Sequence, residues 1–449
     1  MSKGIRTRKG ATISLNGEAE KIIKEYTSSS SVAIQPDDFF AMTPKLLVKE
    51  GTVVEKGEPI FFDKNKPEIQ FVSPVAGKLT QVLRGAKRKI LALVLTPEGD
   101  KAVKHKTAQW EKLNREEAIR LLLDSGNWPF LGQRPYGVVA NPKADPKALF
   151  ISTFASAPLE VDFDFLLKNN KEEFQRGINF LSKLVPEIFL SAEASFGGFF
   201  ENIENATYVP VKGQHPAGNL SVQIHQLAPL NMGETVWTIR PEDVVNIGVF
   251  LETGEFSAQR TVAVAGSAVG APQYIKTTIG TQLSELLDQA EVDQNLANRY
   301  INGDVLSGTA TTENGYLGYF NNLVTVIPEG NEYRIFGWLP FLDNHIPSLS
   351  KTSLAWLFGK KKFDVNTNLN GEERALVVTG EMERVFPMDI FPMQLIKACM
   401  TGDIEKMEAL GIYEVVPEDF GLVDYANTSK IEAQEIIKDA LTLMIKEVG

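Results

Sequence analysis

Residue types that carry chemistry in proteins are sparse in this chain. It has one cysteine, Cys399. A single thiol forms no intrachain disulfide and cannot by itself hold a zinc ion or an iron–sulfur cluster. Four histidines are scattered along the sequence: His105, His215, His225 and His345. None has an HxH or HxxxH partner, so the sequence predicts no histidine-built metal site.

Motifs for phosphate binding and nucleophilic catalysis are also missing. The sequence contains no GxGxxG, no GxxxxGK[ST] and no GxSxG. The Gly197-Gly198 pair is flanked by phenylalanines, which would crowd a phosphate. The carboxylate pairs Asp37-Asp38 and Glu116-Glu117 are adjacent in sequence, a pattern typical of solvated loops and helices. Taken alone, these residues predict a scaffold without its own reaction centre.

The composition indicates a globular protein of several domains. The 449 residues include 43% hydrophobic residues, and 46 basic against 57 acidic side chains give a net charge of −11. This balance is too apolar for a disordered chain, and the length suggests about three domains. The acidic charge argues against nucleic acid and against simple adsorption to anionic lipid.

Hydropathy gives an expectation about location. No apolar run approaches the roughly 20 residues that span a bilayer, and no apolar segment typical of a secretory signal follows the basic start. We therefore expect a protein of the cytoplasm or of the cytoplasmic face of a membrane. Basic clusters at 84–89 and 360–362 are either solvated turns or docking sites for an acidic protein.

Residues 1–105 are predicted to form one β-rich domain. Glycines punctuate short β-branched runs, as in the succession Ser73-Pro-Val-Ala-Gly77, which is typical of hairpins. This segment resembles the barrel-sandwich domain of biotinyl and lipoyl carriers. Lys66 lies near the position of the carriers' modified lysine, but Asn65 and Pro67 flank it in place of the carrier motif. We therefore expect an unmodified domain.

Residues 106–257 are predicted to form a Rossmann-like α/β domain. Strands are expected over 147–153, 187–191 and 206–211. Asn114 with Glu117 predicts a capped helix over 115–124, and Asn170 with Glu173 predicts a second one. Alternating strands and helices of this length favour a parallel or mixed sheet with helices packed on it.

Two further regions complete the predicted order. Residues 258–330 show a strand, a turn, a helix starting at Thr281 and another strand, an order that resembles the SLBB (soluble ligand-binding β-grasp) module. Residues 331–449 are partly helical. The last helix is predicted to begin at Ser429, with Glu432 completing a capping box. The fold class is therefore multidomain α+β and α/β.

This order of domains, together with stretches along most of the chain, points to a family. The stretches include Ser73-Pro-Val-Ala-Gly77, Asp124-Ser-Gly-Asn-Trp128, Gly213-Gln-His-Pro-Ala-Gly218, Leu306-Ser-Gly308, Phe336-Gly-Trp338 and Glu383-Arg-Val-Phe-Pro-Met-Asp389. The chain resembles the NqrA family of the bacterial sodium-translocating NADH:quinone reductases. The resemblance implies a peripheral subunit that partners the other subunits of that complex, including integral membrane subunits. It implies quinone as substrate, with NADH, FAD, FMN and the 2Fe-2S centre on the other subunits.

The family is similar in turn to the flavin-binding subunits of respiratory complex I and of the Rnf complex. Their glycine-rich flavin loop matches residues 126–135 here. Trp128, Phe130 and Pro135 stand where close backbone approach to a phosphate would need glycine. We therefore predict that this chain binds neither FMN nor NADH.

A quinone site would need an apolar slot with a few hydrogen-bond donors. Two aromatic loops and one histidine loop offer this mixture. The candidate quinone-binding residues are Phe39, Phe40, Met42, Trp128, Phe130, Arg134 and His215. The same rings could instead be core or subunit-contact residues, and His215 could be a structural loop residue. Two hypotheses follow: a subunit that binds or positions quinone, and a purely structural docking subunit with no ligand of its own.

Overall fold

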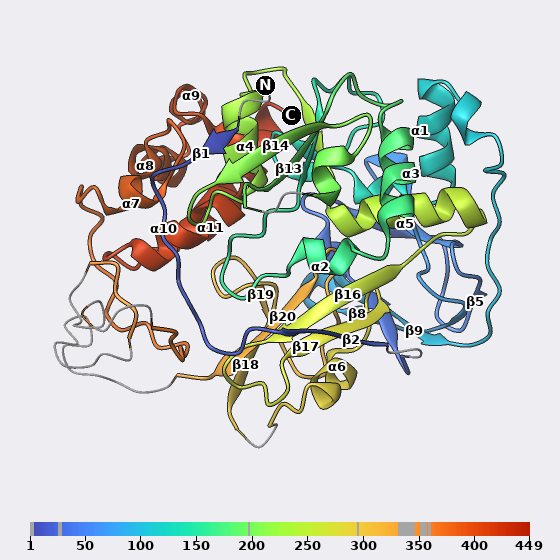
Figure 1. Cartoon of the computed structure of the whole chain (residues 1–449), viewed down its shortest axis with the longest axis horizontal. Helices are drawn as coiled ribbons and strands as arrows, with labels where there is room; N and C mark the ends of the chain where they lie inside the picture. The colour runs from blue at the N-terminus through green and yellow to red at the C-terminus, as the bar shows by residue number, and fades with distance from the viewer. Residues whose placement is uncertain are drawn as a thin grey trace.

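The computed structural model describes residues 4–25, 29–195, 198–293, 296–330, 346–350, 357 and 361–449. Three β-sheet regions form one body, and a group of helices lies against it (Figure 1). His345, Lys360 and the Phe336-Gly-Trp338 stretch lie outside the described residues.

A seven-stranded sheet forms the centre of the α/β region. Its strand order is β1-β14-β13-β12-β15-β10-β11. The strands are β1 (Ile5–Arg6), β10 (Gly132–Arg134), β11 (Val138–Val139), β12 (Leu149–Ser152), β13 (Ile188–Glu193), β14 (Thr207–Lys212) and β15 (Val236–Thr238). The strands from β1 to β15 run parallel, whereas β10 and β11 continue the sheet antiparallel. The strands predicted from the sequence are β12, β13 and β14.

Helices cover both faces of this sheet. They are α1 (Arg115–Asp124), α2 (Phe163–Leu167), α3 (Lys171–Leu181), α4 (Leu220–Leu227) and α5 (Pro241–Thr253), with short 3₁₀ turns η3 (Trp110–Lys112), η4 (Trp128–Phe130) and η5 (Phe199–Asn202). Leu149 and Ile151 of β12 share a core with α3 and α5, whereas Phe150 packs with α4. The alternation of side chains along a strand therefore places α3 and α5 on one face and α4 on the other.

Local signals for the first helices were partly correct. The predicted capping box of α1 is confirmed, because the Asn114 side chain accepts from the Glu117 amide and the Glu117 carboxylate accepts from the Asn114 amide. The predicted cap of α3 was wrong. Asn170 is its N-cap residue but makes no side-chain capping hydrogen bond. Its backbone is not extended there, so the side chain is not directed at the first turn.

The barrel-sandwich region consists of two small sheets. One has the order β3-β9-β8-β5 and the other β4-β6-β7. The elements are β3 (Val32–Ile34), η1 (Pro36–Asp38), β4 (Pro44–Leu46), β5 (Val53–Val54), β6 (Pro59–Asp63), β7 (Lys66–Val72), β8 (Gly77–Arg84), η2 (Ala86–Arg88) and β9 (Ile90–Pro97). Lys64 and Asn65 form the turn between β6 and β7, and Lys66 is the first residue of β7. The basic residues of η2 are exposed, and Lys89 pairs with Asp37 over 2.7 Å.

The β-grasp region is a six-stranded mixed sheet with the order β19-β18-β20-β16-β17-β2. Its elements are β2 (Glu20–Glu25), β16 (Gln259–Ala265), β17 (Gln273–Thr278), α6 (Leu283–Gln289), β18 (Asn298–Asn302), β19 (Thr309–Thr311) and β20 (Leu323–Pro328). Leu283, Leu286 and Leu287 of α6 are fully buried, as is Ala290, its C-cap residue. They pack on the β-branched residues of β16.

The N-terminal segment does not stay within the barrel sandwich. β1 pairs in parallel with β14 of the α/β sheet, and β2 pairs with β17 of the β-grasp sheet. The sequence prediction placed residues 1–105 in one domain. In the structure β1 and β2 instead add to the two neighbouring sheets, which can be followed in Figure 1 along the blue chain.

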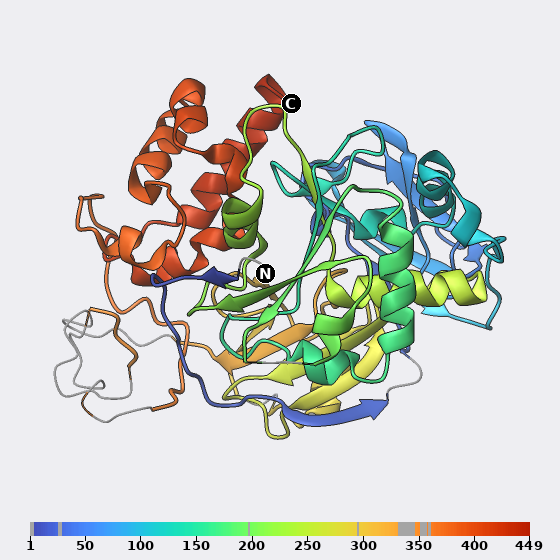
Figure 2. The same cartoon turned by 45° about the horizontal axis from the view of Figure 1, so that its top comes forward.

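Helices dominate the C-terminal region. They are α7 (Glu381–Val385), α8 (Pro392–Thr401), α9 (Ile404–Ala409), η7 (Ile412–Glu414), η8 (Pro417–Phe420), α10 (Gly421–Ala426) and α11 (Ala433–Glu447). They share a separate hydrophobic core and lie beside α4 and the edge of the α/β sheet (Figure 2). Within the described ranges, no helix combines the length and apolar character that crossing a bilayer requires.

The predicted start of the last helix was wrong. α11 begins at Ala433, with Glu432 as N-cap and no capping box. The Ser429 hydroxyl donates instead to the Ala375 carbonyl. The Asp424 carboxylate of the preceding helix accepts from the amides of Ala433 and Gln434. A residue nine positions upstream therefore caps α11, which no local pattern indicates.

Candidate functional site at the carboxyl edge of the α/β sheet

The loops that follow β12 and β14 meet at one edge of the α/β sheet. Both strands run parallel, so their carboxyl ends lie together, which is where open α/β sheets usually bind ligands. The loop after β12 carries Ser156 and Glu160, and the loop after β14 carries His215. The N-terminal segment closes over this edge, because the Ala11 amide donates to the His215 carbonyl over 2.9 Å.

His215 is held by its neighbouring loop. Its Nδ1 lies 3.1 Å from the Ser156 hydroxyl, which also accepts from the Gly218 amide at 2.9 Å. A side chain at position 218 would place its Cβ 2.2 Å from the Phe154 carbonyl oxygen, so glycine permits the two loops to touch. Burial lowers the pKa of His215, whereas the nearby carboxylates of Asp304 and Glu418 act to raise it. The predicted loop histidine is therefore a buried, mainly neutral group that links two loops.

The C-terminal region supplies carboxylates to the same edge. Arg134, at the end of β10, donates from Nη2 to Glu418 Oε1 of η8 over 3.2 Å. Asn219, the N-cap residue of α4, donates to Asp419 Oδ1 at 3.3 Å. Asp419 is 1% exposed and also accepts the Val416 amide at 2.9 Å. A helix N-terminus that commonly receives a ligand anion is thus occupied by a carboxylate of this chain.

The β-grasp region contributes Asp304, from the turn after β18. Its carboxylate accepts from the amides of Leu306 and Ser307, which fixes the turn. Burial raises the pKa of Glu160 to about 7, and the nearby Asp304 carboxylate adds to the rise while Arg240 opposes it. Burial likewise raises the pKa of Asp419 to about 7, with Glu418 adding to the rise.

These side chains are referred to below as the polar junction. Its members are Arg134, Glu160, His215, Asp304, Glu418 and Asp419. They come from five separate segments of the chain and include two carboxyl groups with a pKa near neutrality. The junction can hold or release protons near pH 7 and can orient a polar ligand. Within the described residues, no group of three histidine, cysteine or acidic side chains is arranged to hold a metal ion.

Two of the predicted aromatic residues lie deep in the main core. Trp128 is fully buried, donates from Nε1 to the Ala140 carbonyl over 2.8 Å and meets Trp237 edge-on at 5.3 Å. Phe130 is 2% exposed and stacks on Phe256 with ring centres 5.8 Å apart. The bulky side chains of the 126–135 segment, Trp128 and Phe130, are therefore part of the hydrophobic core.

The second aromatic loop is divided between two cores. Phe39 is 3% exposed and packs edge-on against Phe71 and Tyr319 at 4.5 and 4.9 Å. Phe40 is half-buried against the C-terminal core, and Met42 is half-buried against the main core. The structure therefore brings Arg134 and His215 together at the polar junction but separates them from Trp128, Phe130 and Phe39.

Most of the polar junction was not identified from the sequence. Glu160, Asp304, Glu418 and Asp419 stand in separate loops or turns with no shared motif. Asn219 before a helix is a local signal for α4, but nothing local indicates that η8 reaches it. Only Arg134 and the Gly213–Gly218 loop, proposed for its position after a strand, were singled out beforehand.

A large cavity adjoins the polar junction. Its volume is about 940 Å³, and it is bounded by the N-terminal segment, β18, β19, residues 346–350 and 364–374, and the C-terminal helices. Apolar lining residues include Ile13, Ile301, Leu306 and Ile431. Ala11 also lines it and pairs with His215, while Leu306 is held by Asp304. The cavity thus has apolar lining residues and lies next to the junction, whose own members do not line it.

Comparison with known families agrees with this architecture. Residues 5–98 match the model described as "NqrA N-terminal barrel-sandwich hybrid domain", residues 113–256 match "NqrA second alpha/beta domain", and residues 261–313 match "NQRA C-terminal domain". These matches confirm the predicted fold class of barrel sandwich, α/β domain and β-grasp module with a C-terminal helical region.

Full-length relatives agree as well. The NqrA protein of the Na(+)-translocating NADH-quinone reductase of Photorhabdus laumondii is 34% identical over 452 residues, covering 99% of this chain and 100% of the relative. The protein of the same name from Neisseria meningitidis is 33% identical over 449 residues, with 99% and 100% coverage. That from Marinomonas is 34% identical over 446 residues, with 98% and 99% coverage. The chain therefore belongs to the NqrA family of Na(+)-translocating NADH-quinone reductase subunits.

Proposed function

We propose that this chain is the peripheral NqrA subunit of a sodium-translocating NADH:quinone reductase and that it positions quinone without carrying electrons itself. Its partners are the other subunits of that complex, including integral membrane subunits, at the cytoplasmic side of the inner membrane. NADH, FAD, FMN and the 2Fe-2S centre are bound by those subunits. The family membership supports a place in that complex. The geometry described above supports the proposal that the cofactors are bound by other subunits.

The packing at the carboxyl edge of the sheet supports the absence of a prosthetic group on this chain. Trp128 and Phe130 fill the flavin position, and Asp419 occupies the N-terminal end of α4. A flavin phosphate would have to displace these buried groups and leave Arg134 without Glu418. Displacing a buried, hydrogen-bonded carboxylate is costly, because its partners lose their acceptor.

The single observation that carries the quinone proposal is the cavity beside the polar junction. Its volume of about 940 Å³ lies within the range of about 300–1,000 Å³ typical of small-molecule sites. An apolar wall suits the ring and tail of a quinone, and polar groups at one side suit its carbonyl oxygens. None of the residues predicted for quinone lines this cavity. His215 is joined to it through Ala11, a lining residue whose amide donates to the His215 carbonyl, whereas Trp128, Phe130 and Phe39 would contribute only by supporting the fold.

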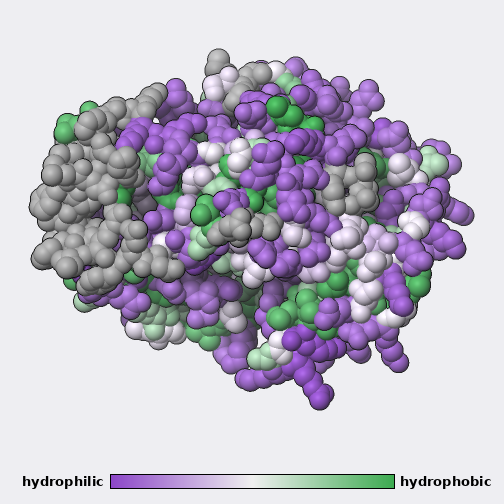
Figure 3. Space-filling model, turned by 90° about the horizontal axis from the view of Figure 1, so that it is seen from below, coloured by the Kyte–Doolittle hydropathy of each residue, from purple (hydrophilic) through white to green (hydrophobic). Residues whose placement is uncertain are grey.

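A second function, docking alone, has its own support. The family of this chain acts in a complex, and no electron-carrier motif occurs in the sequence. The face seen in Figure 3 is mainly hydrophilic with small apolar groups between the polar ones. Exposed large apolar side chains are found on several separate elements, among them Leu47, Val53, Met232, Phe391 and Met400. A docking subunit would use several such small contacts.

The two functions are distinguished by titrating the purified full-length chain with a short-tailed quinone analogue. Ala310 lines the cavity and is exposed, so Ala310→Trp should fill the cavity and weaken binding at least tenfold. Thr309 neighbours it on the same strand and does not line the cavity, so Thr309→Trp is the matched control. Weakening by Phe40→Ala but not by Ala310→Trp would place the ring in the aromatic loop instead. No saturable binding by the unaltered chain would leave the docking function.

A further inference from the structure

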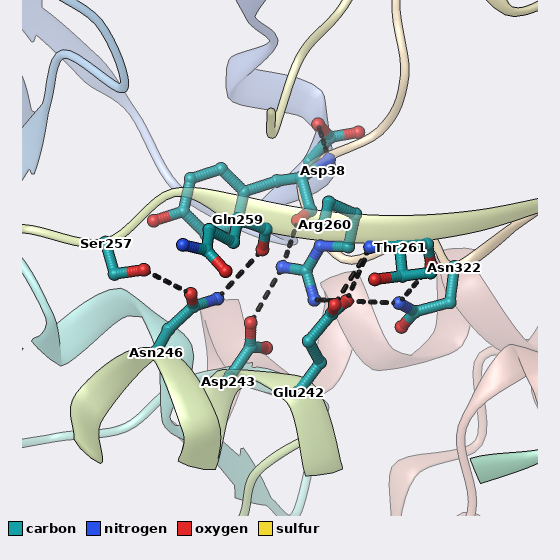
Figure 4. A network of polar contacts seen from close by, with 10 residues as sticks. Asp38, Glu242, Asp243, Asn246, Ser257, Gln259, Arg260, Thr261 and Asn322 are labelled. Carbon is teal, nitrogen blue, oxygen red and sulfur yellow. Dashed lines mark hydrogen bonds and ion pairs between the residues drawn. The ribbon is translucent and has the colours of Figure 1, made fainter. Parts of the chain in front are cut away.

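A buried ionic network joins three parts of the chain, and it is independent of the quinone proposal. Arg260 on β16 is fully buried. Its Nη2 donates to Asp243 Oδ1 over 2.7 Å and to the Tyr319 carbonyl over 2.9 Å. Its Nη1 lies 3.5 Å from Glu242 Oε2. Figure 4 shows the arginine between the first turn of α5 and the loop before β20. This cluster of Arg260, Glu242 and Asp243 is called the Arg260 joint.

The joint also reaches the barrel-sandwich region. Tyr319 makes the link: its carbonyl accepts from Arg260, and its amide donates to Asp38 Oδ2 over 2.8 Å. Asn322 donates to Glu242 and to the Thr261 carbonyl, which ties α5 to β16. Elements of the α/β and β-grasp regions therefore meet at Arg260, and the barrel-sandwich region is joined to them through Tyr319.

The charges of the joint do not balance if every group is ionised. One guanidinium faces two carboxylates, and Arg260, Asp243 and Glu242 are 0%, 0% and 5% exposed. Two further groups favour the ionised carboxylates: the N-terminal end of α5, in whose first turn they lie, and Arg240, which is exposed to solvent. Asp38 and the Tyr319 hydroxyl, on the opposite side, contribute no positive charge. An excess negative charge in such a buried place is strongly unfavourable, and uptake of a proton removes it.

The hydrogen-bond donors decide which carboxylate carries the proton. Both Glu242 oxygens already face N–H groups, since the Thr261 amide lies 2.8 and 3.1 Å from them and Asn322 Nδ2 lies 2.5 Å from Oε2. A proton on Glu242 would point at one of these donors. Asp243 receives Arg260 on Oδ1, whereas its buried Oδ2 has no hydrogen-bond partner. The Asn246 side-chain amide also acts on the Asp243 carboxyl, but its Nδ2 donates to the Gln259 carbonyl over 3.0 Å, so a proton on Oδ2 breaks none of these hydrogen bonds.

We infer that Asp243 is a buried proton-binding site, protonated on Oδ2 in the folded protein at neutral pH, which keeps the Arg260 joint uncharged. Burial raises the pKa of Asp243, and the opposing effect of Arg260 is shared between two carboxylates. In the unfolded chain this carboxyl has its ordinary pKa of about 3.9. The folded state therefore holds one proton more than the unfolded state above that pH, and the joint weakens as the pH rises toward the folded-state pKa.

The test compares two isosteric variants of the full-length protein. Asp243→Asn imitates the protonated acid, so its melting temperature should equal or exceed that of the unaltered protein. Glu242→Gln turns an amide NH₂ toward existing donors, so its melting temperature should fall. In infrared spectra at neutral pH, the carbonyl stretch of one protonated carboxylic acid should disappear in Asp243→Asn and persist in Glu242→Gln. Between the unfolded-state and folded-state pKa values, the equilibrium constant for unfolding of the unaltered protein should rise about tenfold per pH unit. Asp243→Asn should lack this contribution.

Two outcomes would overturn the assignment. If Asp243→Asn lowers the melting temperature as much as Glu242→Gln and leaves the infrared band unchanged, both carboxylates are ionised and the joint holds an excess charge. If the band disappears only in Glu242→Gln, the proton lies on Glu242. Infrared spectra are read from folded samples, so a modest loss of stability in either variant does not prevent the comparison.

Discussion

Arg134 at the end of β10 and Glu418 in η8 are 284 residues apart and form an ion pair over 3.2 Å. The contact fastens the C-terminal helices to β10, an antiparallel strand of the α/β sheet. The arginine side chain is 10% exposed and the glutamate side chain 40%. The pair therefore has one buried and one partly hydrated member, and its removal affects the two members differently.

Glu418→Gln should lower the free energy of unfolding by about 1 kcal/mol, because Arg134 keeps its charge in a buried place but loses its ionised partner. Urea denaturation followed by limited proteolysis of the C-terminal region measures this. Glu447→Gln, which breaks an exposed pair with Lys446, serves as control and should change nothing measurable. Equal effects of the two substitutions would show that Glu418 is not needed for attachment.

The attachment of the C-terminal helices should weaken between mildly acidic and mildly alkaline pH. Burial raises the pKa of Asp419 to about 7, so the folded protein holds a proton there that the unfolded chain, with a pKa of about 3.9, has released. Stability from this group is complete below the unfolded value and is lost as the pH rises to about 7. Hydrogen exchange of α10 and α11, measured from about pH 5 to about pH 8, follows the change. In Asp419→Asn, the protection of α10 and α11 from exchange should depend less on pH. An unaltered pH dependence would exclude Asp419 as its source.

The two asparagines that precede α1 and α3 provide a matched comparison. Asn114→Ala removes a capping hydrogen bond and should cost about 1 kcal/mol of stability. Asn170→Ala removes a side chain that makes no such bond and should cost much less. Thermal melts of the two variants measure the difference. A larger loss for Asn170→Ala would contradict the capping geometry.

Gly218 should not tolerate a side chain. The Cβ of Gly218→Ala would lie 2.2 Å from the Phe154 carbonyl oxygen, forcing apart the loops that hold His215, at a cost of about 2 kcal/mol. Gly99→Ala is the control, because position 99 has open space around it and carries only the cost of its positive φ, about 1 kcal/mol. The melting temperatures and the NMR signal of the His215 ring report the change. A His215 signal that stays in place would show that the loops have room to adjust.

Much of the local structure follows from short sequence patterns. The capping pair of Asn114 and Glu117 defines where α1 starts, and the leucines of α6 are buried as their spacing indicates. These features depend on neighbours within one or two turns of helix, so the sequence contains all the interacting groups. The bulk of Trp128 and Phe130 likewise indicated a crowded segment, because side-chain volume is a property of the residue itself.

The remaining features were decided by the tertiary structure. Asp424 caps α11, β1 and β2 join sheets of other domains, and Arg260 bonds to Asp243 of α5. Each depends on groups that are distant in sequence and meet only after the hydrophobic cores have packed. The polar junction is the clearest case. Its acids lie in ordinary turns, and the raised pKa values of Glu160 and Asp419 arise from burial and from neighbouring carboxylates, which act only in the folded chain. The sequence alone thus determined the family and the local elements, whereas packing determined which polar groups meet and what charge they carry.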